Sequence, residues 1–278
     1  MIKLRNLTQR YPIVFAVVLM AAFELIPRFV NYILEFLPDG YGSWAIAHFA
    51  HILWPLALTF LLGYGFVLKE KGFGKTFKAG LGLVGVYLAI AVFGVFYTLS
   101  NPDVQWRPWY GMLIGIMALF GIGLREDLLY RGVLQSALAI KYADSSKGIW
   151  LTVAVSSIAF GLLHFLNMFT GTTFEAAFYQ VLGAAALGAA FGAIYLRGGN
   201  IWVPILIHAL VDFTGIFNAM FIVGGGSTTD KINSLSAEGL LWNVPVPLLV
   251  AIFLLRKSKH AEILERMKAL RAKYGIKA

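Results

Sequence analysis

The sequence contains no cysteine, which excludes disulfides, thiolate nucleophiles and zinc–thiolate sites. It is also poor in charge, because only 13% of its 278 residues are Asp, Glu, Lys or Arg. By contrast, 59% are hydrophobic and the mean hydropathy is +0.75. Soluble domains are not normally so apolar and disordered chains never are, so the composition indicates a membrane protein.

No linker or low-complexity stretch divides the chain, and apolar runs recur along its whole length. A helix needs roughly 17–25 apolar residues to cross a hydrocarbon core about 30 Å thick. Such runs cover about residues 11–27, 44–68, 78–99, 108–124, 148–166, 175–196, 201–222 and 239–255. We therefore predict an all-α, polytopic membrane protein of about eight transmembrane helices, with one domain over residues 1–278. The helix at 108–124 is expected to continue to about Ile140.

The net charge of +9 is distributed unevenly over the loops. Most basic residues precede the first run, follow the last one, or lie in the alternate loops between them. The positive-inside rule then predicts an integral membrane protein with both termini in the cytoplasm. Topology and anionic lipid account for the basic charge, so no nucleic acid partner is expected. Residues 257–278 form a basic tail with Ile263, Leu264, Met267 and Leu270 at helical spacing, which predicts a cytoplasmic amphipathic helix on the membrane surface.

Ionisable residues lie within stretches that otherwise read as buried in the membrane. They occur in three segments and are Glu126, Asp127, Arg131, His164, His208 and Asp212. A charge at mid-bilayer costs at least about 2.5 kcal/mol on insertion scales, so such residues usually mark a functional site. We expect the three segments to enclose a shared, water-accessible polar pocket.

Helical spacing predicts how these residues pair. Asp127 and Arg131 are four apart and share a face, so we expect a supporting ion pair. Glu126 points about 100° away from Asp127 and has Tyr130, not a base, four residues on. An isolated carboxylate in an apolar setting suits a general base or acid. His208 and Asp212 are also four apart, so Asp212 is expected to orient His208 or to accept a proton.

The segments EDLLYRG (126–132), FGLLH (160–164) and HALVD (208–212) resemble the three ordered motifs of the CAAX-protease and bacteriocin-processing family, also called the Abi family. These motifs are Glu-Glu-x-x-x-Arg, Phe-x-x-x-His and His-x-x-x-Asn/Asp. The resemblance covers about residues 110–220. The family includes the Ras-converting endopeptidase that trims prenylated proteins, and many prokaryotic relatives, so a prokaryotic cell membrane is the expected location.

The resemblance implies an intramembrane endopeptidase that acts on membrane-embedded or membrane-associated peptides or proteins. Glu126 would be the general base that activates water, His164 would position that water, and His208 with Asp212 would stabilise the oxyanion. This division of labour is chemically sensible, because water needs a base and the oxyanion needs donors. The family's second Glu is Asp127 here, so activity depends on whether this position only pairs with Arg131 or touches the water.

Two questions stay open at the level of sequence. No cofactor is required, yet Glu126, His164 and His208 have the ligand types of a His₂Glu zinc site, although no HExxH motif is present. A non-catalytic peptide-binding or bacteriocin-immunity scaffold is an alternative function, mainly because of Asp127. A proton-coupled transporter is a weaker one, because transporters usually contain inverted repeats and no internal repeat is found.

Overall fold

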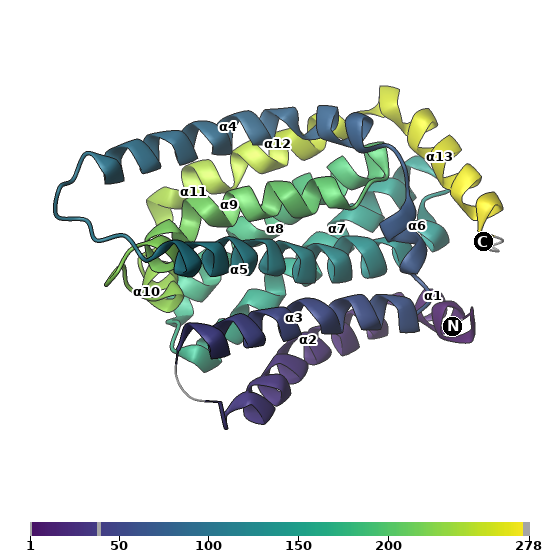
Figure 1. The fold of residues 1–278 in the computed structure, drawn as a ribbon. Coiled ribbons are helices and arrows are strands. Elements are labelled where there is room, and N and C mark those ends of the chain that lie inside the picture. Colours follow the sequence, from purple (N-terminus) through teal and green to yellow (C-terminus); the bar gives the residue numbers. More distant parts are fainter. Residues whose placement is uncertain (1, 38–39, 275–278) are drawn as a thin grey trace.

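The computed structural model describes residues 2–37 and 40–274, which form a bundle of helices (Figure 1). In this described part, β-structure is limited to one isolated bridge between Trp106 and Ile222. The α-helices are α1 (Ile2–Arg10), α2 (Pro12–Leu34), α3 (Tyr41–Leu61), α4 (Phe73–Leu99), α5 (Trp109–Asp127), α6 (Ser136–Tyr142), α7 (Ser146–Leu163), α8 (Phe174–Gly198), α9 (Trp202–Phe221), α10 (Thr228–Asn233), α11 (Ala237–Asn243), α12 (Pro245–Leu254) and α13 (His260–Lys273). The shorter elements are η1 (Gly65–Lys69), η2 (Leu128–Gln135), η3 (His164–Thr170) and η4 (Lys257–Lys259).

The prediction of an all-α, polytopic membrane protein is confirmed. Every apolar run named above coincides with a helix or, at residues 237–254, with two consecutive helices. Six of these segments are long and apolar enough to cross a membrane. In α3 the apolar part is the shorter Ala45–Leu61, and α5 ends in the charged residues 125–127. The count of eight spans therefore stays a prediction.

Helix α8 lies at the centre of the bundle. In its most apolar stretch 61% of the residues are buried, compared with 18% in α2, which presents its side chains outward. Helices α7, α12 and α4 pack against α8, while α5 packs against α9 and α3 (Figure 1). Small residues permit the close approach of α7 to α8, because a Cβ added at Gly161 of α7 would lie 2.8 Å from the Cβ of Ala185 in α8.

The chain runs from α5 through η2 into α6 without leaving a helical path, so the predicted continuation past Glu126 is confirmed. The turns of η2 are wider than α-helical ones, a π-helix in which all eight residues are buried. Two backbone carbonyls there accept side-chain hydroxyls, at 3.0 Å from Ser156 to Tyr130 and 3.2 Å from Ser136 to Arg131. π-helical turns are rare and occur often at functional sites.

Helices α1, α6 and α13 lie at one end of the bundle, and α10 lies at the other (Figure 1). The tail prediction is wrong in one respect. In α13 the side chains of Ile263, Met267 and Leu270 are buried against the protein and not against lipid. Glu262 of α13 also pairs with Lys75 of α4 at 2.6 Å. Residues 275–278 of the predicted tail lie outside the described residues.

Candidate active site

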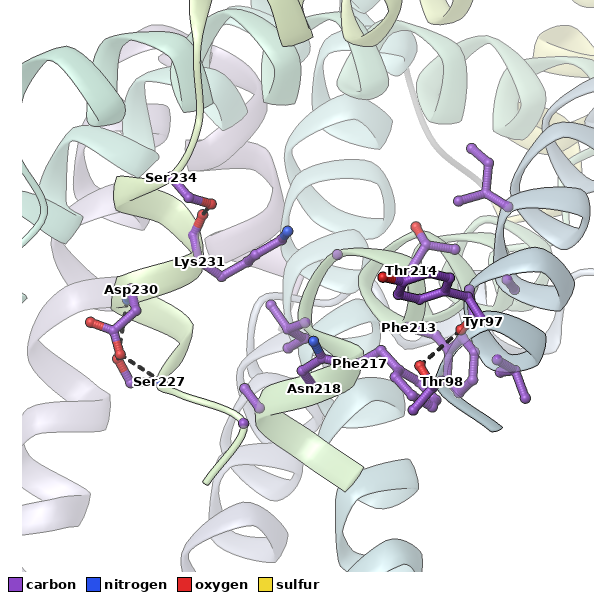
Figure 2. A pocket seen from close by; sticks show the side chains of 18 residues that line it. Tyr97, Thr98, Phe213, Thr214, Phe217, Asn218, Ser227, Asp230, Lys231 and Ser234 are labelled. Atoms are coloured by element: carbon purple, nitrogen blue, oxygen red, sulfur yellow. Dashed lines mark hydrogen bonds between the residues drawn. The ribbon is translucent and has the colours of Figure 1, made fainter. Parts of the chain in front are cut away.

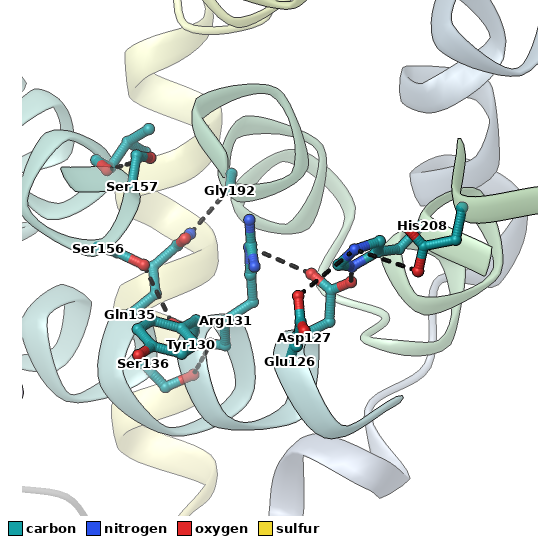
Figure 3. A network of polar contacts seen from close by, with 12 residues as sticks. Glu126, Asp127, Tyr130, Arg131, Gln135, Ser136, Ser156, Ser157, Gly192 and His208 are labelled. Atoms are coloured by element: carbon teal, nitrogen blue, oxygen red, sulfur yellow. Dashed lines mark hydrogen bonds and ion pairs between the residues drawn. The ribbon is translucent and has the colours of Figure 1, made fainter. Parts of the chain in front are cut away.

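The last turn of α5 brings two carboxylates to the imidazole of His208 on α9 (Figure 3). Nδ1 of His208 lies 2.8 Å from Oδ2 of Asp127, and Nε2 lies 3.6 Å from Oε2 of Glu126. Because a carboxylate accepts, the Nδ1–H group of His208 donates to Asp127. That hydrogen bond fixes the ring orientation and leaves Nε2 facing Glu126.

Asp127 serves two partners at once. Its Oδ1 lies 3.1 Å from Nε of Arg131, so the ion pair expected from the spacing is present, and its Oδ2 accepts from His208. All three side chains are buried. We expected Asp212 to orient His208. Oδ2 of Asp212 lies 3.7 Å from Nε2 of His208, within ion-pair distance, and Asp127 makes the hydrogen bond to Nδ1. The shorter side chain of Asp127 is sufficient for both contacts.

The guanidinium of Arg131 is held by charge and by aromatic faces. Its Cζ atom lies 4.1 Å from the ring centre of Phe160 and 5.3 Å from that of Phe191. No aligned hydrogen bond reaches its nitrogens in the described part of the chain, although Asp127 is adjacent. Gly188 leaves the space for it, because an added Cβ would lie 3.2 Å from Nη2 of Arg131. Such a cation–π arrangement in a desolvated setting contributes about 2 kcal/mol.

Glu126 is not the isolated carboxylate that the sequence suggested. Nη2 of Arg125 lies 3.6 Å from its Oε1, and His208 lies at the same distance from its Oε2. The guanidinium of Arg125 rests over the ring of Phe23, at 4.6 Å from the ring centre. The prediction considered bases one helical turn away and therefore missed the neighbour in the sequence. Arg125 is thus a site residue that the analysis by spacing did not identify.

His164 ends α7 and faces the same site. Its Nδ1 lies 3.0 Å from the backbone carbonyl oxygen of Phe160, so the Nδ1–H group donates. In the neutral ring, Nε2 is then an acceptor. The ring of Phe160 stands edge-on to both histidines, with centroid distances of 5.1 Å to His164 and 5.9 Å to His208. Phe160 therefore separates the two imidazoles and fixes their relative position.

These side chains line one cavity of about 240 Å³, which we call the base cavity. Its walls include Glu126, His164, His208 and Asp212, together with Arg125. Asp212 has its Oδ2 buried without a hydrogen-bond partner in the described residues. The structure thus brings the acidic segment and the two histidine-bearing helices to a common, hollow site, which is the arrangement expected from the sequence. A cavity of this size, lined by several polar groups, has room for a water molecule beside Glu126.

The proposed zinc ligands do not form a metal site in this arrangement. Among the described residues no three His, Asp or Glu side chains are placed to hold a metal ion. The Nδ1 atoms of His208 and His164 are engaged by Asp127 and by a backbone carbonyl, and these contacts leave the Nε2 atom of each ring as its possible ligand atom. As they are placed among the described residues, Glu126, His164 and His208 do not form a three-ligand group, and no chemical step is assigned to a metal.

Comparison with known proteins agrees with the motifs. The family model for Rce1-like type II CAAX prenyl endopeptidases matches residues 105–214, which include α5, α7, α8 and most of α9. No curated protein and no solved structure matches the chain. The match contains all three motifs that carried the resemblance. The match therefore supports the resemblance of residues 105–214, and with them the candidate site, to the CAAX-protease and bacteriocin-processing family.

Proposed function

We propose that the protein is an intramembrane endopeptidase that hydrolyses peptide bonds of membrane-associated proteins or peptides with a water molecule activated by Glu126. The observation that carries the proposal is the convergence of Glu126, His164 and His208 on the base cavity. The family match supports a protease at the coarser level. The glutamate mechanism is our own inference from the geometry.

In the proposed reaction Glu126 takes a proton from water while the water oxygen bonds to the peptide carbonyl carbon. Nε2 of His164 accepts a hydrogen bond from the second O–H group of the water and so orients the oxygen lone pair toward the carbonyl carbon. The carbonyl oxygen becomes an oxyanion, which His208 stabilises through a proton on Nε2. The tetrahedral intermediate then collapses, the C–N bond breaks, and Glu126 returns the proton to the leaving nitrogen. Glu126, His164 and His208 thus provide the base, the orienting acceptor and the oxyanion donor, none of which bulk water holds in place.

Asp127 and Asp212 support His208 in different ways. Asp127 accepts from Nδ1 and is itself neutralised by Arg131, so it holds the ring without contacting the water. Asp212 cannot donate to an oxyanion as a carboxylate. Its position 3.7 Å from Nε2 instead suits electrostatic support of a proton on that nitrogen. On this view, the replacement of the family's second Glu by Asp127 is compatible with activity.

The decisive experiment compares membranes that contain the wild-type protein with membranes that contain Glu126→Gln. Peptidomics should show a set of cleavage products that falls at least about 100-fold in the variant, because removal of a proton acceptor or an oxyanion donor typically costs 100-fold or more. Glu238→Gln is the matched control, since Glu238 is exposed in the first turn of α11. Unchanged products with a folded Glu126→Gln protein would instead support the non-catalytic scaffold.

A further inference from the structure

Two more cavities continue the base cavity. One, of about 250 Å³ and here called the apolar cavity, shares His164, His208 and Asp212 with the base cavity. The other, of about 400 Å³ and here called the outer cavity, lies between α4, α9 and α10 (Figure 2). It shares Gly215 and Lys231 with the apolar cavity. The three cavities therefore lie next to one another along a path past the candidate catalytic groups, which we call the passage.

A break in α9 opens this passage. Ile216 leaves the helical conformation, with φ −121° and ψ 22°, so the helix is kinked one turn after Asp212. The neighbouring Gly215 is exposed, and no atom lies within 4 Å of a Cβ built there. At Gly215 the surface between the outer and apolar cavities is therefore formed by backbone alone, without a side chain. A substrate segment can lie across it without displacing a side chain.

The passage leads to the end of the bundle opposite α13. The wall of the outer cavity includes Ser227, Asp230 and Lys231, which belong to α10 or cap it (Figure 2). The α10 segment is fixed in place, because Asn233 accepts from the backbone N–H of Thr173 at 2.9 Å. Helix α13 and most of the basic loops lie at the other end of the bundle. With the termini in the cytoplasm, as the charge distribution predicts, the α10 end faces outward.

From this arrangement we infer that the substrate is an extended peptide segment presented on the non-cytoplasmic side of the membrane, which enters at α10 and crosses Gly215 to reach Glu126. The inference rests on the proposed function for the cleavage step, but the side from which the passage opens can be measured without any activity. It selects exported peptides and outward-facing segments of membrane proteins as substrates.

Because the chain has no cysteine, single cysteines report accessibility without interference. We would place Gly215→Cys in the passage, Ser236→Cys at the exposed cap of α11, and Ser258→Cys as the matched control at the α13 end. Intact cells are treated with a membrane-impermeant maleimide. Gly215→Cys and Ser236→Cys should react at once, whereas Ser258→Cys should react only after permeabilisation. The reverse pattern overturns the inference.

A second measurement tests whether the substrate uses the passage. A bulky maleimide on Gly215→Cys should reduce cleavage at least about 10-fold, and the same label on Ser258→Cys should leave cleavage unchanged. Gly183→Cys provides a second blocking position, because an added Cβ there makes only an ordinary 3.8 Å contact with Asn243. Full cleavage by both labelled passage variants would refute the route. Loss of cleavage in Glu126→Gln with no effect of the labels would leave the proposed function intact and overturn only the route.

Discussion

Replacement of Arg131 by Met tests the contact on which the site is built. The guanidinium of Arg131 and the carboxylate of Asp127 are both buried, with 1% and 0% of their side chains exposed. Arg131→Met keeps an unbranched apolar side chain but leaves Asp127 with His208 alone. Removal of one partner from a buried ion pair costs about 3–5 kcal/mol, because the remaining charge is uncompensated.

The expected loss is large enough to measure in detergent. At roughly 2–4 °C per kcal/mol for a chain of this size, the unfolding midpoint of Arg131→Met should fall by roughly 6–20 °C. Thermal unfolding of the purified protein checks this shift. Arg256→Met is the control, since Arg256 is exposed and its Nη1 donates to the carbonyl of Phe253. That change should alter the free energy of unfolding by less than about 0.5 kcal/mol.

A double variant separates charge from packing. Asp127→Asn added to Arg131→Met removes the uncompensated carboxylate, so the double variant should be more stable than Arg131→Met alone. The coupling energy for neighbouring residues of one network is about 0.5–3 kcal/mol. A midpoint for Arg131→Met within about 2 °C of the wild type, or strict additivity in the double variant, would refute the view that this pair stabilises the bundle.

Three further predictions concern α13 and the metal question. The contacts of Lys75 and Arg197 lower the pKa of Glu262 to about 2 from an ordinary 4.5, so this contribution to stability is complete above about pH 4.5 and is lost as the pH falls toward 2. Glu262→Gln should therefore lose less stability than the wild type as the pH falls, which thermal unfolding at a series of pH values measures. Met267→Ala should lower the free energy of unfolding by about 2–5 kcal/mol and speed proteolysis near residue 256, because the side chain of Met267 is only 3% exposed where it packs against the bundle. If α13 were bound to lipid alone, the substitution would leave the unfolding of the bundle unchanged. A zinc chelator should leave cleavage by the purified protein unchanged in a product assay, and restoration of lost activity by zinc would contradict the metal-free mechanism.

Much of the fold follows from the apolar runs, because a membrane-spanning helix is specified by length and hydropathy. The order of the helices and their approximate ends were therefore predictable. The tail was harder to interpret. The pattern of Ile263, Met267 and Leu270 specifies an apolar face but not what covers it, and lipid and protein satisfy such a face equally well. The polar anchors that decide for protein, such as Glu262 with Lys75, link segments far apart in the sequence.

The same reasoning explains which contacts of the site were predictable. Spacing along one helix gave the pairing of Asp127 with Arg131, because both lie on one face. The hydrogen bond between Asp127 and His208 depends instead on how α5 packs against α9, which periodicity does not encode. Arg125 was missed because adjacent residues on a helix point about 100° apart, although a long side chain can still fold back to Glu126.

The docked C-terminal helix gives the order of synthesis a physical meaning. Nη1 of Arg266 donates to the last-turn carbonyl of Leu196, and the guanidinium of Arg271 donates to the carbonyls of Ile140 and Ala139. The oxygens of Leu196 and Ile140 lie in the last turns of α8 and α6, where helical carbonyls lack the usual partner, whereas that of Ala139 also accepts from the backbone N–H of Ala143. Because α13 follows α6 and α8 in the chain, those helices are made before it and expose these carbonyls and the apolar seam until α13 docks. A chain truncated before Arg266 therefore leaves that end of the bundle open.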